Sequence, residues 1–71
     1  MNENIQYLCD NANLEAIKKL SAIQLPIKEM IIYLETKIEE YDNVLNNDTN
    51  NLVYFLKNKS TECVLYLKKI Q

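Results

Sequence analysis

The sequence contains no glycine and only one proline, Pro26. Sandwiches and barrels need many turn residues with positive φ, and glycine is the residue that adopts such φ values without a steric cost. A chain without glycine is therefore poorly suited to an all-β fold. Its absence favours an all-α protein.

Histidine and arginine are also absent, so all eight basic residues are lysines. Serine and cysteine nucleophiles most often depend on a histidine base, and ordinary zinc sites use histidine ligands. Arginine makes the commonest specific contact with guanine in DNA, and the formal net charge of −2 does not favour phosphate binding. We therefore predict no catalytic, cofactor-binding or metal-binding residues, and we expect no nucleic-acid partner.

Long apolar runs are missing as well. No segment approaches the roughly 18 apolar residues of a membrane span, and the first residues lack the pattern of a secretory signal. We expect a cytoplasmic protein without a membrane partner, in which Cys9 and Cys63 are reduced, packed thiols on apolar helix faces. The abundance of Asn, Ile, Lys and Tyr suggests an AT-rich coding sequence, as in many phages and other viruses, and the cytoplasm is then that of the host.

The short length of the chain limits its core. Its 71 residues allow a single domain, residues 1–71, and a chain of this size buries only about 60% of its unfolded surface. Disulfides, a metal ion or oligomerisation usually reinforce such small domains. Two cysteines can form at most one bridge, so we expect dimerisation to complete the fold.

Three helical stretches are predicted, and the first leaves two alternatives open. Apolar residues at helical spacing favour one helix over about residues 3 to 24. The side chains at positions 10, 11 and 13 are also good N-caps, which favours a short helix to about Cys9 and another over residues 14 to 24. The predicted fold is an antiparallel bundle or helical hairpin with three helices, or four if the first is split.

The other two helices have clearer boundaries. Pro26 suits the first turn of a helix that continues to about Asn46. The asparagines that follow suit a left-handed helix exit, and Asp48 or Thr49 suits the next N-cap. The third helix is predicted from about Asn50 to Lys69.

Residues 25 to 47 carry apolar side chains at alternating spacings of four and three residues. On a helical wheel these side chains fall within about 100°, the width of a core-facing stripe. The stripe faces either the other helices of the same chain or a second copy in a coiled coil, and both alternatives stay open. The predicted core seam consists of Ile27, Ile31, Leu34, Ile38, Tyr41 and Leu45.

Several apolar residues lie off the main helix faces and are predicted to contact a partner. Ile32 and Tyr33 lie beside the seam, and Tyr54 and Leu65 lie almost opposite the main face of the third helix. Lys59 lies within that face, where a lysine either extends its charge to solvent or fixes the register of an oligomer. The predicted main face of the third helix comprises Leu52, Phe55, Leu56, Cys63, Tyr66, Leu67 and Ile70.

Residues 14 to 34, LEAIKKLSAIQLPIKEMIIYL, resemble the helix pair that follows the winged helix-turn-helix in MerR-type transcription regulators. In that family a leucine-rich helix leads through a short turn towards a dimerising helix. The resemblance covers less than a third of the chain, and the usual turn glycine and the DNA-reading head are absent. It implies a dimerisation element in place of a DNA-binding protein.

Together these features predict a non-enzymatic helical interaction module. We expect it to form a homodimer, or to dock as an inhibitor or adaptor on another protein of unknown identity, through an apolar helix face. The alternative is a transcription-associated regulator that binds nucleic acid through a lysine patch assembled only in the dimer.

Overall fold

The protein is helical throughout, with short connections, in the part of the chain that its computed structural model describes, residues 3–21 and 26–71. The helices are α1 (Glu3–Asp10), α2 (Leu14–Ser21), α3 (Ile27–Asn47) and α4 (Asn51–Ile70). The all-α prediction is confirmed, and of the two alternatives for the first stretch the split helix is observed. The predicted end of its second part at residue 24 lies outside the described residues.

The split between α1 and α2 occurs at a Schellman motif. The N–H of Asn13 donates to the carbonyl of Leu8 (3.2 Å), and the N–H of Ala12 donates to the carbonyl of Cys9 (3.1 Å). Ala12 has a φ of 50°, a left-handed conformation that glycine usually provides, and it is buried in the core. Asn13 then caps α2, because its Oδ1 accepts from the N–H of Ala16 (3.1 Å).

Helix α3 begins one residue later than predicted. Pro26 directly precedes the helix, and its carbonyl accepts from the N–H of Met30 (3.0 Å). At the other end, Asp48 is extended, with a φ of −155°, while its N–H still donates to the carbonyl of Val44 (3.0 Å). The predicted left-handed exit is therefore wrong.

Helix α4 is capped by Asn50, whose Oδ1 accepts from the N–H groups of Leu52 (3.0 Å) and Val53 (3.1 Å). The predicted N-caps, Asp48 and Thr49, are wrong. The N–H of Asp48 still donates to the last turn of α3. The segment that connects α3 to α4 therefore begins only after this residue. The cap consequently falls on the last asparagine before α4.

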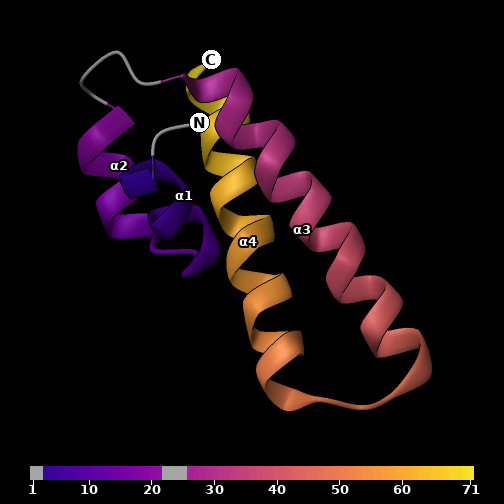
Figure 1. The fold of residues 1–71 in the computed structure, drawn as a ribbon. Coiled ribbons are helices and arrows are strands. Elements are labelled where there is room, and N and C mark those ends of the chain that lie inside the picture. The colour runs from indigo at the N-terminus through magenta and orange to yellow at the C-terminus, as the bar shows by residue number, and fades with distance from the viewer. Residues whose placement is uncertain (1–2, 22–25) are drawn as a thin grey trace.

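Helices α3 and α4 form an antiparallel hairpin, and α1 and α2 pack on one side of it (Figure 1). Helix α1 contacts α3 and α2 contacts α4. Both short helices lie beside the end of the hairpin remote from its connecting segment. We call residues 41–59 the distal half of the hairpin. Among the described residues, no third helical layer covers this half. The radius of gyration of the chain, 12.0 Å, accordingly exceeds the value of about 11 Å typical of a compact chain of this length.

The core lies where the two short helices meet the hairpin. Within the predicted seam, Ile31 and Leu34 are buried, whereas Tyr41 and Leu45 in the distal half are only half-buried, as are Ile27 and Ile38. For Tyr41 and Leu45 the difference follows from coverage, because α1 and α2 reach only part of the hairpin. The buried apolar residues are Ile5, Cys9, Ala12, Ile17, Met30, Ile31, Leu34, Cys63, Val64 and Leu67.

Ser60 is a polar residue within this core. Its side chain is almost fully buried, and its Oγ is the one buried side-chain oxygen or nitrogen without a hydrogen-bond partner in the described part of the chain. Burying a hydroxyl group without a partner costs about 1–3 kcal/mol. Ser60 therefore reduces the stability of the fold.

Replacing Leu34 by alanine should lower the free energy of unfolding by about 2–5 kcal/mol, because the leucine is completely buried. Replacing Leu45 should cost less, because this side chain is only half-buried in the distal half. Urea denaturation followed by circular dichroism measures both losses. Equal losses would show that the two halves of the hairpin are equally well packed.

Replacing Ser60 by alanine should stabilise the protein more than replacing its neighbour Thr61 does. Both substitutions gain roughly 0.5 kcal/mol of helix propensity, but only Ser60 buries an unpartnered hydroxyl group. Thr61 is exposed, and its Oγ1 donates to the carbonyl of Lys57 (2.9 Å). The melting temperatures of the two variants give the comparison, and a Ser60→Ala variant no more stable than Thr61→Ala contradicts the assignment.

Candidate interaction surfaces

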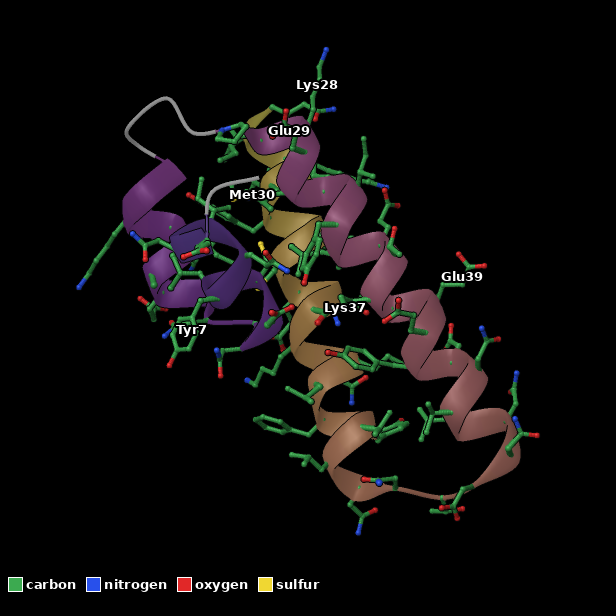
Figure 2. The ribbon with its side chains drawn as sticks, viewed as in Figure 1. Tyr7, Lys28, Glu29, Met30, Lys37 and Glu39 are labelled. Atoms are coloured by element: carbon green, nitrogen blue, oxygen red, sulfur yellow. The ribbon has the colours of Figure 1, made fainter. Side chains whose placement is uncertain are left out.

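The α3–α4 hairpin has two faces with different surroundings. Met30 and Lys37 project from α3 on the side of α1 and α2, whereas Glu39 projects from the opposite side (Figure 2). Each face carries exposed apolar side chains. The hairpin therefore has two candidate interaction surfaces, one on each face.

The first surface lies in the distal half and is named here the distal apolar face. Leu52 is 67% exposed, Phe55 55% and Val44 45%, which are large fractions for apolar side chains gathered at one end of a small domain. The other members are half-buried. The distal apolar face consists of Tyr41, Val44, Leu45, Leu52, Phe55 and Leu56.

This face continues the one that α1 and α2 cover. On α4, Leu52 and Leu56 precede Cys63 by eleven and seven residues, helical spacings that place all three on one stripe. A hollow of about 290 Å³ separates the α1–α2 turn from Phe55 and Lys59. Phe55 therefore lies just beyond the edge of the short helices.

The second surface is a groove between α3 and α4, named here the rear groove. It has a volume of about 330 Å³, and no residue of α1 or α2 lines it. Val64 is buried and Ile38 half-buried, whereas Leu65 is 64% exposed. The residues that line it are Glu35, Ile38, Glu39, Asp42, Thr61, Val64 and Leu65.

The residues predicted to contact a partner do not form one surface. Ile32, Tyr54 and Leu65 are exposed, and Leu65 lines the rear groove. Lys59 is half-buried beside the distal apolar face, where its Nζ lies 5.6 Å from the centre of the Phe55 ring. The same Nζ lies 3.7 Å from a carboxylate oxygen of Glu62 on its own helix.

Tyr33 is engaged within the chain, and it is half-buried against the core. Its hydroxyl group donates a hydrogen bond to the carboxylate of Asp10, and the side-chain amide of Gln6 donates to the same hydroxyl (3.4 Å). Burial and the hydrogen bond to Asp10 raise the pKa of Tyr33. Tyr33 thus ties α1 to α3.

Lys37 joins the same cluster. Its Nζ lies 3.8 Å from Asp10 and 5.8 Å from the centre of the Tyr33 ring. Burial lowers the pKa of Lys37, but the neighbouring Tyr33, Asp10 and Glu40 outweigh burial and raise it. The ammonium group therefore stays charged beside the carboxylate that holds α1 in place.

The two thiols lie in the core and are not bonded to each other. Burial, reinforced by the nearby Cys63 and Asp10, raises the pKa of Cys9 to about 11. Burial and the charge of Glu62 likewise raise the pKa of Cys63 to about 11. Thiolate, the nucleophilic and metal-binding form, is consequently scarce near neutral pH.

Sequence reasoning missed the distal apolar face. Leu52 and Phe55 were predicted on the main apolar face of the third helix but are exposed, and Val44 was not singled out. The alternative in which the first stretch splits at positions 10 to 13 could have predicted this exposure. Two short helices cannot cover the full length of a hairpin made of two long helices. Each short helix has eight residues and is about 12 Å long.

In the described ranges, no helix has both the length and the apolar character needed to cross a bilayer. Residues 3–21 and 26–71 also hold no group of three or more Cys, Asp or Glu side chains arranged to ligate a metal ion.

Comparisons of the chain with family models, with curated proteins and with solved structures find no match. They add no support to the resemblance of residues 14 to 34 to MerR-type regulators.

Replacing Tyr33 by phenylalanine should destabilise the protein by about 1–3 kcal/mol, because it removes a hydrogen bond to the charged Asp10. The amide protons of α1 should then exchange faster with solvent, as measured by NMR. Tyr7→Phe is the matched control, since this tyrosine projects from the outer side of α1 (Figure 2) and is 67% exposed. If the amide protons of α1 exchange at the same rate in both variants, the hydrogen bond of Tyr33 does not stabilise α1.

Proposed function

We propose that this protein is a non-enzymatic helical interaction module that forms a homodimer through its distal apolar face. The observation that carries the proposal is the exposure of Val44, Leu52 and Phe55 on a hairpin face that α1 and α2 cover elsewhere. Within residues 3–21 and 26–71, no helix forms a third layer over the distal half. A second copy supplies one.

The geometry of a symmetric dimer supports this choice of partner. In a twofold dimer the same patch meets itself, so the distal hairpins of two copies together make a four-helix bundle at the centre of the assembly. Each pair of short helices then lies at an outer end. The solvent-accessible area, 4967 Å², already exceeds the value of about 4600 Å² expected for a compact monomer of this mass.

The charges of the distal half also permit self-association. Residues 41–59 contain two aspartates, Asp42 and Asp48, and two lysines, Lys57 and Lys59. The segment therefore has no net formal charge at neutral pH. Two copies that meet there experience little mutual repulsion.

The side-chain chemistry supports binding over catalysis. Cys9 and Cys63 are buried, with pKa values raised to about 11, which disfavours a nucleophilic role for either thiol. Several of the lysines that a nucleic-acid interface would use are paired with carboxylates. Lys18, Lys57, Lys59 and Lys68 lie between 2.6 and 3.9 Å from such partners, which reduces the positive potential available for phosphate.

The proposal predicts that the purified chain sediments as a dimer at micromolar concentration and melts at a temperature that rises with concentration. A Leu52→Glu and Phe55→Lys double variant, which keeps the net charge, should be monomeric with unchanged helicity. Charged groups in this position would face an apolar contact without a partner. Analytical ultracentrifugation and circular dichroism measure the two properties.

The matched control is an Ile32→Lys and Tyr7→Glu double variant. It alters two side chains of similar exposure, 64% and 67%, away from the distal apolar face, and it should remain dimeric. A wild-type chain that is monomeric throughout the concentration range overturns the homodimer. If the control variant is monomeric and the Leu52→Glu and Phe55→Lys variant remains a dimer, the dimer contact lies outside the distal apolar face.

A further inference from the structure

Near each end of the rear groove, an ion pair connects the two helices of the hairpin. At one end Lys57 Nζ lies 2.6 Å from Asp42 Oδ1. At the other, Lys68 Nζ lies 3.2 Å from Glu35 Oε2. Since Glu35 and Asp42 are seven residues apart on α3, the open stretch between the ion pairs is about 10 Å long.

Glu39 lies between these two ion pairs and is itself unpaired. It is exposed, it lines the groove, and its carboxylate has no salt bridge or hydrogen bond with any residue that the structure describes. The hydrogen bond and the charge of Asp42 raise the pKa of Lys57, so that lysine stays charged and bound to its own partner. One negative charge therefore remains at the middle of the groove.

An apolar floor lies next to this charge. Val64 is buried and Ile38 is half-buried against the core, and the exposed Leu65 also lines the groove from α4. Thr61 also lines the groove, and its hydroxyl oxygen can accept a further hydrogen bond. The groove thus combines a short apolar channel with a carboxylate and a hydroxyl group.

We propose that the rear groove binds a long basic side chain, arginine or lysine, presented by a helix of a partner protein. The methylene groups of such a side chain match the apolar floor of Ile38, Val64 and Leu65. Its cationic head reaches Glu39, where a charge-assisted hydrogen bond forms. The distance between the two ion pairs admits one extended side chain of this kind.

This site is separate from the distal apolar face. Glu39 projects from the side of α3 turned away from α1 and α2 (Figure 2), and no member of the distal apolar face lines the groove. A dimer formed through the distal face leaves the groove accessible. The two proposals can consequently succeed or fail independently.

The test uses the full chain and alanine-rich helical peptides of about 15 residues, long enough to form a helix. Two leucines flank a central arginine in the first peptide. The second has citrulline, a neutral isostere of arginine, and the third has lysine. The arginine peptide should bind at least about threefold more tightly than the citrulline peptide, and it should shift the methyl NMR signals of Ile38, Val64 and Leu65.

Glu39→Gln and Glu40→Gln form the matched pair of variants. Glu40 is also an exposed carboxylate, but it lies outside the groove and 3.6 Å from Lys37. The preference for arginine over citrulline should disappear in Glu39→Gln and persist in Glu40→Gln, with circular dichroism unchanged in both. Equal binding of the two peptides by the wild-type chain, or a preference that survives in Glu39→Gln, overturns the proposal.

Discussion

Helices α1 and α2 are each about 12 Å long, whereas α3 and α4 are about 30 Å long. The short helices therefore cover only part of the hairpin, and the core closes only where they lie. Leu34 and Leu67 are completely buried there, whereas Leu52 and Phe55, farther along the hairpin, remain exposed. The distal apolar face is thus a direct consequence of helix length.

The short helices are held by a small number of specific contacts. Asp10, at the end of α1, accepts a hydrogen bond from Tyr33 and lies 3.8 Å from the ammonium group of Lys37. The Schellman motif at Ala12 then reverses the chain, so that α2 can reach α4. These contacts decide how far along the hairpin the core extends.

The same arrangement explains why the two faces of the hairpin differ in chemistry. The face toward α1 and α2 is largely apolar and continues without a change of character into the distal half. The opposite face carries the carboxylates of Glu35, Glu39 and Asp42, and two of these, Glu35 and Asp42, form ion pairs with lysines of α4. One face is consequently suited to another apolar helical layer, and the other to a basic side chain.

The sequence by itself determined the all-α class, the split of the first stretch as one of two alternatives, and most helix ends to within a few residues. These features depend on local physics, namely apolar spacing, Pro26 and asparagine caps. The tertiary structure decided which of the residues on one predicted helix face are buried. Leu52 and Leu67 belong to the same predicted face of α4, yet only Leu67 is buried. Tyr33 was predicted at a contact surface, but Asp10, 23 residues away in the sequence, accepts its hydrogen bond. Periodicity places a residue on a face of its helix, but the length and position of the neighbouring helices determine whether that face meets solvent.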